Sequence, residues 1–442
     1  MTKLDEHPTV IRHRRRAPAE VPGVLDAEWL RRLCLDAGAD DVGFVAIDRS
    51  EVDDQRAEIL RAFPSTRTLV SLVGRMNPEP VRSPARSAAN QEFHASYEHM
   101  DEVTRKVVRA LGEAGVPAMN PTSAFPMEMD RYPGRIWVVA HKPVAVAAGL
   151  GQMGLHRCVI HPVFGSFISL GTILLSRDVA AVSEPIDYNP CVECKLCVAA
   201  CPVGAIGADG YFNFSACMTH NYREFMSGFT DWVSTIADSR GGDDYRRRVA
   251  ESESASMWQS LSFKANYKAA YCVAVCPAGE DVIGPFLDDR KRFLEGVVDP
   301  LKSKEEPVYV IPGSDAEAHV ARRFPWKTIR RVRGLRAGSI PGFLFGLRLT
   351  FQREAARGLS ATYHFTFTGR EPAEATVTIR DRSINVQDGH EGEAQVRITA
   401  DSDAWLGFLS GTRSLVWAMI RRKIRVRGPL RLLVAFGKCF PS

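Results

Sequence analysis

Apolar and polar positions follow different patterns at the two ends of the chain. In residues 25–182, strands are predicted from apolar runs at 41–47, 68–73 and 163–176. Helical stretches are predicted around and between them, at 25–37, 52–62 and 91–115. Because strands that alternate with helices are typical of an α/β domain, we predict an α/β domain over residues 25–182.

Residues 338–442 instead alternate apolar with polar residues one by one. The pattern predicts strands at 363–367, 375–380, 383–387 and 394–400. Such alternation is typical of antiparallel strands with one covered face. Helices are predicted at 403–409, 415–421 and 430–436, with a short strand at 424–426. This part is therefore predicted to be an α+β domain.

Most of the ten cysteines lie between these two parts. Cys191, Cys194, Cys197 and Cys201, followed by Pro202, form the pattern C-x2-C-x2-C-x3-C-P. In bacterial ferredoxins the first three cysteines of this pattern bind one iron–sulfur cubane and the fourth binds the other. A zinc site fits less well, because zinc sites usually take two separated C-x2-C pairs. We predict an α+β ferredoxin-like 4Fe-4S module over residues 183–290.

The second half of the cysteine pattern is incomplete. Cys272 and Cys276 repeat its tail, but Asn266 and Ala269 stand where a full repeat has cysteines. Cys217 is the nearest replacement. The predicted metal ligands form one complete set, Cys191, Cys194, Cys197 and Cys276, and one set that is a thiolate short, Cys201, Cys217 and Cys272. The second centre is then a 3Fe-4S cluster, a 4Fe-4S cluster with a non-cysteine ligand, or a cluster that takes Cys158 from upstream.

Composition and charge narrow the class of protein. The chain has 442 residues, 45% hydrophobic and 25% charged, and no apolar run reaches the ~18 residues that span a membrane. Cysteines concentrated in a cluster motif indicate a reducing cytoplasm. Residues 1–24 are predicted to be a disordered basic tail, because no apolar stretch follows Arg14-Arg15-Arg16 as an export signal requires. Residues 291–337, charged and punctuated by prolines, are predicted to be a linker.

The net charge is +5, and the basic residues concentrate late, in 322–336 and 421–427. They form either a solvated face or a surface that attracts anionic lipid, at the periphery of a membrane, or an acidic redox partner. No nucleic-acid-binding motif accompanies them, which argues against nucleic acid as a partner.

The segment before the cysteines carries a glycine pattern. Ala148-Gly-Leu-Gly-Gln-Met-Gly154 precedes His161-Pro-x-Phe-Gly165, and both precede the cysteines. In this order the motifs resemble the epoxyqueuosine reductase and reductive dehalogenase superfamily over about 35–290. The resemblance implies a cobalamin-binding domain, with the clusters delivering electrons to cobalt. The cofactor contacts it implies are Gly149, Gly151, Gly154, His156, Arg157, Phe164 and Gly165. The alternative for the glycines is a tight turn, and for His156 and Arg157 a cap on that turn.

The segment 127–135 departs from both families. Epoxyqueuosine reductases carry an aspartate acid in a V-D-S-A-P-type segment, and Asp130 is its candidate counterpart here, although the flanking residues differ. Reductive dehalogenases pair a tyrosine with a basic residue, and Tyr132 with Arg131 or Arg135 resembles that pair. The predicted catalytic residues, as proton donors, are Asp130 and Tyr132. The alternative is an exposed loop.

The C-terminal part resembles the sterol-carrier-protein lipid-binding domain. The resemblance rests on A-x-G-L-x-A-x-Y-x-F-x-F, which begins at Ala356, on the strands, and on Ile424-Arg-Val-Arg-Gly428. It implies a lipid tail held between a sheet and helices. The tunnel residues it implies are Phe343, Phe345, Leu347, Trp405, Leu409, Trp417 and Leu432, and the alternative is that they form an ordinary core.

Together these patterns predict an iron–sulfur, cobalamin-dependent reductase. Its substrate is expected to be a small or lipophilic molecule with a carbon–halogen, epoxide or C–O bond to cleave. Its electrons are expected to come from a ferredoxin, a flavodoxin or a reductase. The alternatives are an electron-transfer protein without corrinoid, and a lipid carrier whose clusters are structural or redox-sensing.

Overall fold

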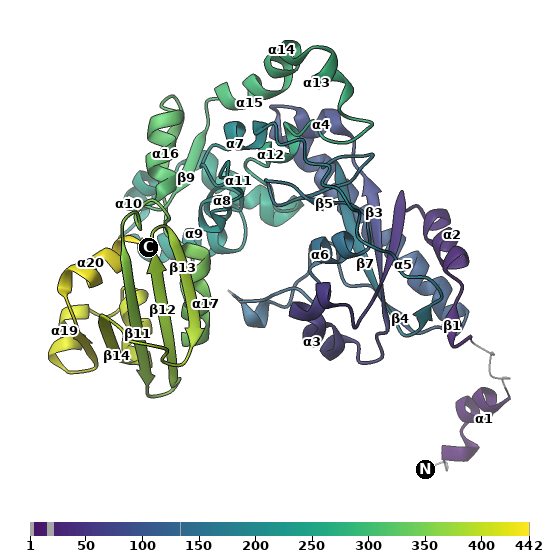
Figure 1. Ribbon diagram of the computed structural model, residues 1–442, viewed down its shortest axis with the longest axis horizontal. Helices are drawn as coiled ribbons and strands as arrows, with labels where there is room; N and C mark the ends of the chain where they lie inside the picture. The colour runs from purple at the N-terminus through teal and green to yellow at the C-terminus, as the bar shows by residue number, and fades with distance from the viewer. Residues whose placement is uncertain (1–3, 16–21, 133, 442) are drawn as a thin grey trace.

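The computed structural model describes residues 4–15, 22–132 and 134–441, and Figure 1 shows its course from purple to yellow. The first described segment contains η1 (Leu4–Glu6) and α1 (Pro8–Arg14). The prediction of a disordered tail is thus corrected for α1, while Arg16 lies outside the described residues. Among the described residues, no helix combines the length and the hydropathy needed to cross a bilayer.

The N-terminal domain is built on a four-stranded antiparallel sheet in the order β2-β3-β7-β4. The strands are β2 (Asp41–Ala46), β3 (Thr68–Arg75), β4 (Ala118–Met119) and β7 (Ile168–Leu175). Residues 68–74 of β3 are all buried, because helices cover both faces of the sheet. Its other elements are β1 (Val24–Leu25), η2 (Ser50–Val52), α4 (Pro78–Arg82), η3 (Met129–Arg131), β5 (Gln152–Met153), β6 (Val159–Ile160) and β8 (Asp178–Val179). The α/β prediction is confirmed.

Two helices pack on each face of this sheet. α2 (Ala27–Ala37) and α5 (Arg86–Glu113) share one core with the sheet. α3 (Asp53–Ala62) and α6 (His141–Ala147) lie on the opposite face, in a second core. The apolar runs of the strands are long because neither face is exposed to water.

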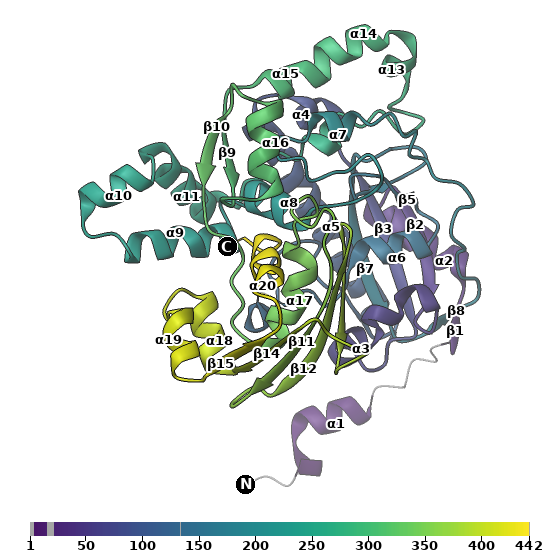
Figure 2. The same ribbon diagram turned by 60° about the vertical axis from the view of Figure 1, so that its left-hand side comes forward.

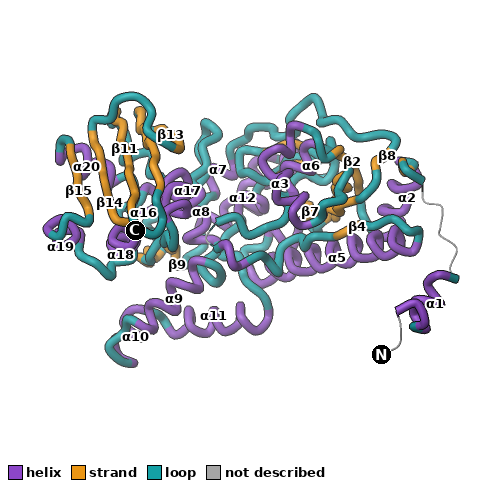
Figure 3. The backbone as a smooth tube through the Cα atoms, turned by 90° about the horizontal axis from the view of Figure 1, so that it is seen from below, coloured by secondary structure: helices purple, strands orange, loops and turns teal. Residues whose placement is uncertain are grey.

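The cluster domain consists of short helices joined by loops. α7 (Leu196–Ala200), α8 (Phe214–Asn221) and α12 (Tyr271–Ala274) carry or flank the cysteines. An insertion of three helices projects from them (Figure 3): α9 (Ser227–Ala237), α10 (Gly242–Arg248) and α11 (Glu251–Phe263). Arg223, at its base, is only 3% exposed and donates to Asp231 and Glu253 at 2.7 Å each. A buried ionic network therefore fixes the insertion to the domain.

Residues 291–337 are folded, which corrects the prediction of a linker. They contain a parallel pair of strands, β9 (Pro307–Val310) and β10 (Thr328–Arg331), joined by helix α16 (Asp315–Arg323). The preceding helices are α13 (Gly284–Asp288), α14 (Arg290–Phe293), η4 (Leu294–Val298) and α15 (Asp299–Ser303). Val308, Val310 and Val320 join the core of the cluster domain, so this unit belongs to that domain.

The C-terminal domain has a five-stranded sheet in the order β13-β12-β11-β14-β15 (Figure 2). The strands are β11 (Ser360–Thr368), β12 (Ala373–Arg380), β13 (Ser383–Asp388), β14 (Val396–Asp401) and β15 (Ile424–Arg427). Only the pair β11–β14 is parallel. The helices are α17 (Ile340–Thr350), α18 (Ser402–Leu409), α19 (Leu415–Ile420) and α20 (Leu430–Lys438). The α+β prediction is confirmed.

Replacing Arg223 with alanine is expected to loosen the insertion. The change leaves Asp231 and Glu253 buried without a cation, which typically costs about 3–5 kcal/mol. Hydrogen exchange of residues 222–263 should accelerate accordingly. Arg246→Ala is the control, because Arg246 and Asp243 form an exposed pair that contributes about 1 kcal/mol or less. Equal exchange in the two variants would contradict the proposed anchoring.

Candidate metal centres and binding cavity

The cysteines of the ferredoxin pattern gather into a first group of four. Burial, then the thiols of Cys276, Cys194 and Cys191, raise the pKa of Cys197 to about 12. Burial and the charges of Cys276 and Cys191 also raise the pKa of Cys194. These four cysteines are therefore near enough for their charges to interact, and their assignment as the complete ligand set remains a prediction.

A second group forms around Cys272. Burial raises the pKa of the Cys272 thiol well above its usual value, and Cys158, Cys217 and Cys201 raise it further. Burial raises the pKa of Cys217 to about 12, again with Cys201 and Cys158 adding to the effect. The second group therefore contains a fourth thiol, Cys158, from the N-terminal domain.

Both groups suit iron–sulfur clusters. Four converging buried thiols repel one another when ionised, and iron supplies the positive charge that stabilises all four as thiolates. Within the described residues, no three Cys, His, Asp or Glu side chains are arranged to hold a single metal ion. An iron–sulfur cluster needs its thiolates farther apart than a single metal ion does, because the thiolates bind different iron atoms.

His156 lies between the two cysteine groups. It is 4% exposed, and its Nδ1 accepts a hydrogen bond from the Cys158 backbone N–H at 3.1 Å. Burial lowers the pKa of the imidazole, but the neighbouring Cys158 and Cys276 thiols raise it more, to about 10. Arg157, the next residue, is exposed and donates to the Gly210 carbonyl at 3.1 Å. His156 thus faces the cysteines, and Arg157 ties the loop to the cluster domain.

The glycines of the 148–154 segment are packed against the protein itself. A Cβ on Gly149 would lie 2.3 Å from the Glu184 carbonyl oxygen, and one on Gly151 the same distance from that of Ile160. Gly154 faces the Ile160 side chain. The missing Cβ atoms make room for the protein's own chain, so these glycines form no open cradle for a planar cofactor.

Phe164 and Gly165 belong to the joint between the N-terminal domain and the cluster domain. Phe164 stacks on His161 with ring centroids 4.7 Å apart. The Gly165 Cα faces the Ala278 carbonyl oxygen, only 1.9 Å from where a Cβ would stand. The backbone N–H groups of Glu280 and Asp281 donate to the carbonyls of Pro162 and Val163 at 2.9 and 3.0 Å. The cofactor role assigned to the seven residues remains a prediction, and their observed contacts hold the joint together.

The predicted proton donors lie on a segment fixed to α3. Arg131 donates to Glu58 at 2.5 Å, and Arg135 to the Asp54 carbonyl at 2.7 Å. Asp130 is exposed. Tyr132 is half-buried, and burial raises its pKa. Phe125 of this segment packs against Phe225 of the cluster domain with ring centroids 6.0 Å apart, and Tyr132 lies beside Ser227 and Thr230 at the start of α9.

Sequence reasoning missed the residues that surround the second cysteine group. The Lys142 ammonium lies 3.9 Å from the Cys158 sulfur and donates to the Arg157 carbonyl at 2.8 Å. Burial raises the pKa of Cys158, but Lys142 and His156 lower it more, to about 6. Tyr222 packs against Tyr267, with ring centroids 5.7 Å apart, close to these thiols. No sequence motif marks these residues, because they come together only when the domains dock.

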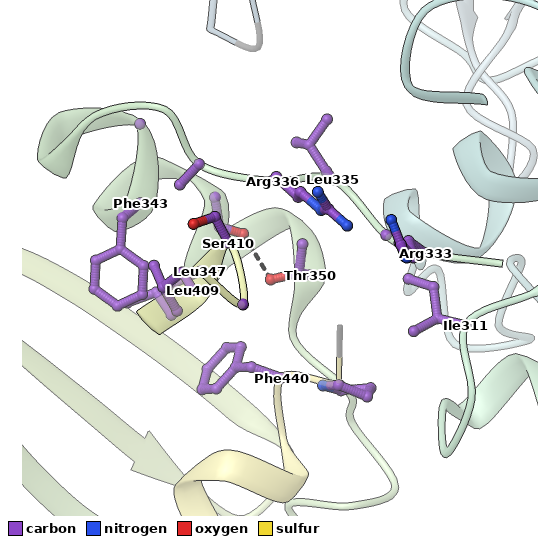
Figure 4. Close-up of a pocket in the computed structure, with 16 residues that line it drawn as sticks. Ile311, Arg333, Leu335, Arg336, Phe343, Leu347, Thr350, Leu409, Ser410 and Phe440 are labelled. Carbon is purple, nitrogen blue, oxygen red and sulfur yellow. Dashed lines mark hydrogen bonds between the residues drawn. The ribbon is translucent and has the colours of Figure 1, made fainter. Parts of the chain in front are cut away.

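A cavity of about 240 Å³ opens between the C-terminal domain and residues 311–337 (Figure 4). Of the predicted tunnel residues, Phe343, Leu347 and Leu409 line it. Trp405 and Leu432 belong instead to the core of the domain. Phe345 and Trp417 are 50% and 62% exposed, which corrects their assignment to a tunnel. Polar groups at the cavity include Arg333, Arg336, Thr350 and Ser410.

The cavity adjoins the cluster domain through two helices in contact. α17, which supplies Phe343, Gly346 and Leu347 to the wall, packs against α8, which carries Cys217. The domains are also tied by Arg353 and Asp209 at 2.6 Å, and by the Tyr211 hydroxyl, which donates to the Phe351 carbonyl at 3.2 Å. The contact between α17 and α8 therefore links the cavity wall to the helix that carries Cys217.

Comparisons with known proteins agree with this architecture. Residues 184–207 match the 4Fe-4S binding domain, and residues 348–441 match the SCP-2 sterol transfer family. Epoxyqueuosine reductase of Gloeobacter violaceus is 27% identical over 203 residues, and that of Vibrio cholerae 23% over 220 residues. The matches cover 45% and 44% of this chain, which spans 58% of the length of each relative.

Solved structures with similar folds come from the same groups. They include the catabolic reductive dehalogenase NpRdhA, with a TM-score of 0.39 and 16% identity over 67% of this chain and 35% of that one. Epoxyqueuosine reductase from Streptococcus thermophilus has a TM-score of 0.34 and 14% identity, covering 61% and 74%. Sterol carrier protein 2 from Yarrowia lipolytica has a TM-score of 0.20 and 12% identity, covering 23% and 91%. The two family matches and the curated relatives confirm the predicted resemblance, a reductase-like iron–sulfur part fused to a sterol-carrier-like domain.

Gly165→Ala is expected to open the joint and to lower the iron content of the reconstituted protein. Gly165 has φ +63°, and its Cβ would strike the Ala278 carbonyl oxygen. Gly313→Ala is the matched control, since Gly313 has φ +73° and open space around it. It should show only the backbone strain of about 1–2 kcal/mol. Iron per chain and melting temperature are the measurements, and equal losses in the two variants would refute the role of the joint.

Proposed function

We propose that the chain is an iron–sulfur reductase that acts on an apolar molecule held by its C-terminal domain. The contact between α8, with its ligand Cys217, and α17, a wall of the cavity, carries this proposal. It gives electrons that reach the second cluster a short path to a bound molecule. In a lipid carrier whose clusters only stabilise the fold, a contact between a cluster-bearing helix and the cavity wall would have no function.

Two one-electron centres match the stoichiometry of a reductive cleavage. Replacing a carbon–halogen bond with C–H consumes two electrons and one proton and releases a halide ion. Opening a C–O bond consumes a second proton, which leaves on the alcohol or water. Each cluster carries a single electron, so the reduced protein holds the pair that one cleavage requires. The electrons would come from a ferredoxin, a flavodoxin or a reductase.

Asp130 and Tyr132 are the proposed proton donors. The position of their segment against the cluster domain supports this role, since Phe125 packs on Phe225 and Tyr132 lies beside Ser227 and Thr230. Exposure lets the Asp130 carboxyl exchange its proton with solvent. The link from Arg131 to Glu58 on α3 holds the segment in place.

A corrinoid has no part in this proposal. When bound, a corrinoid supplies a strongly reducing cobalt centre. The contacts of the assigned residues argue against a corrinoid here, because the three glycines face carbonyl groups or side chains of the protein itself and His156 faces the cysteines. We therefore propose that the clusters reduce the substrate without a corrinoid.

The cavity favours a substrate with a short apolar body and an anionic or polar head. Phe343, Leu347, Leu409 and Phe440 provide the apolar wall. The Arg333 guanidinium is already paired with Asp238 at 2.7 Å, whereas Arg336 is exposed at the rim. Arg336 is therefore the proposed contact for a carboxylate or phosphate head group.

Gly346→Leu is the variant that tests this function. Gly346 lines the cavity and has open space within 4 Å of where a Cβ would stand, so a larger side chain takes up cavity space. Leucine also favours a helix over glycine by up to about 1 kcal/mol. We expect wild-type protein, reduced anaerobically by two electrons per chain, to be reoxidised by apolar carbon–halogen or epoxide compounds without added cobalamin. The variant should take up the same electrons and lose most of the reoxidation.

Gly437→Leu is the control, since Gly437 lies on α20, has open space beside it and does not line the cavity. Reoxidation that requires cobalamin would refute the corrinoid-free route. Binding of a fluorescent fatty acid without any reoxidation would identify a lipid carrier instead.

The surface around α19 suits an anionic membrane. Val416, Trp417 and Ile420 are each more than 60% exposed on this helix. The basic residues 421–423 follow directly, and Arg425 and Arg427 continue the charge on β15. α19 lies at the outer end of the C-terminal domain (Figure 1). In a peripheral membrane contact, apolar side chains enter the membrane interface. Arginines beside them attract the acidic lipid head groups. We propose that this surface brings the cavity to lipid-borne substrates.

Replacing Arg421 and Arg422 with glutamine is expected to weaken sedimentation with vesicles that contain phosphatidylglycerol. Each basic residue near such a surface contributes about 1 kcal/mol, so binding should fall by roughly 30-fold. Arg246→Gln together with Arg247→Gln, on the exposed side of α10, is the charge-matched control. Undiminished binding of the Arg421 and Arg422 variant would contradict the proposed contact.

A further inference from the structure

The second cysteine group needs one more ligand than the ferredoxin pattern supplies. Ala269 lies three residues before Cys272, at the position where the C-x2-C pattern has a cysteine. Ala269 is buried, and its N–H donates to the Asn221 side-chain carbonyl at 3.0 Å. The cluster domain alone therefore offers three thiols, Cys201, Cys217 and Cys272.

Cys158 reaches this group from the N-terminal domain. It lies at the turn between β5 and β6, and its carbonyl accepts a hydrogen bond from the Gly154 N–H at 3.0 Å. The side chain packs on the same core as Cys201, Cys217 and Cys272. The docking of this hairpin on the cluster domain thus completes a set of four sulfur atoms.

The backbone beside Cys158 has the same unusual conformation as the other cysteine loops. Arg157 has φ +60°, a left-handed conformation that costs a non-glycine residue roughly 1–2 kcal/mol. Glu193 and Lys195, on either side of Cys194, and Ala270, two residues before Cys272, have φ +46°, +60° and +54°. Such strain persists where a site requires a particular direction of a side chain. The loop of Cys158 is therefore built like a ligand loop.

The surroundings of Cys158 also suit a cluster ligand. The Lys142 ammonium, 3.9 Å from the sulfur, offers a positive charge to the thiolate. His156 fixes the backbone of Cys158 through its Nδ1 at 3.1 Å. Groups of this kind around ligand sulfurs hold the ligand in place and tune the cluster.

We propose that Cys158 is the fourth ligand of the second cluster, together with Cys201, Cys217 and Cys272, and that this 4Fe-4S cluster bridges the N-terminal domain and the cluster domain. Assembly takes up two ferrous ions, two ferric ions and four sulfide ions, which together form a core of charge 2+. Each of the four thiols loses its proton and binds one iron as a thiolate. Cys158 replaces the cysteine missing at position 269. This inference rests on the two clusters of the proposed function but not on any substrate.

The test is anaerobic reconstitution of the full chain with iron and sulfide, in four forms. Wild type is expected to hold about eight irons, and Cys158→Ala about seven, with the paramagnetic signal of an oxidised three-iron cluster. Cys158→Ala combined with Ala269→Cys should restore about eight irons and abolish that signal, because it rebuilds the C-x2-C pair. Cys439→Ala, which removes a buried cysteine outside both groups, is the control and should match wild type.

Each outcome decides the ligand set. Eight irons and an unchanged spectrum in Cys158→Ala would overturn the proposal. If Cys158→Ala loses more than one iron, restoration of about eight irons in the combined variant still supports the proposal. Failure of the combined variant to regain this iron overturns the proposal. Iron counts and spectra do not depend on substrate reduction, so a failed reductase test leaves this result independent.

Discussion

Mutual repulsion among buried thiolates is the constraint on which the rest of the structure depends. In each group the neighbouring thiols raise the pKa of one member, Cys197 in the first and Cys272 in the second, in surroundings that disfavour charge. Such groups are costly unless iron neutralises them, so folding of this region is coupled to the metal. The short helices α7 and α12 bury most of their residues beside the cysteines, Tyr271 among them. The clusters are therefore expected to form part of the core and to contribute to the stability of this domain.

Patterns that depend on neighbouring residues could be predicted from the sequence. The buried run of β3 and the long amphipathic α5 carry enough residues for their periodicity to be unambiguous. The complete cysteine set was predicted from spacing in the same way, because three of its members lie within residues 191–197, and its role as a ligand set remains a prediction. The region 291–337 could not be recognised as folded, since β9 and β10 are only four residues long and charged residues and prolines surround them.

Contacts between distant segments were the part that sequence could not supply. A glycine shows only that a Cβ is missing, and Gly149 and Gly165 prove to accommodate carbonyl groups of the chain itself. Likewise, a helix of six residues such as α19 gives too few positions to tell its inward face from its outward face, so Trp417 was assigned to a tunnel. The approach of Cys158 to Cys272 depends on how two domains dock, and no local spacing encodes it.

The second cysteine group links all three domains, which gives its position a functional meaning. Cys158 belongs to a hairpin of the N-terminal domain, and Cys217 to the helix that packs against the cavity wall. A shift of either neighbour moves a ligand, because thiolate–iron bonds tolerate little displacement. Binding in the cavity can therefore reach the cluster through α17 and α8. The geometry of the centre depends in turn on the joint around Gly165. The proposed reductase can thus match electron delivery to occupancy of its cavity through a single helix contact.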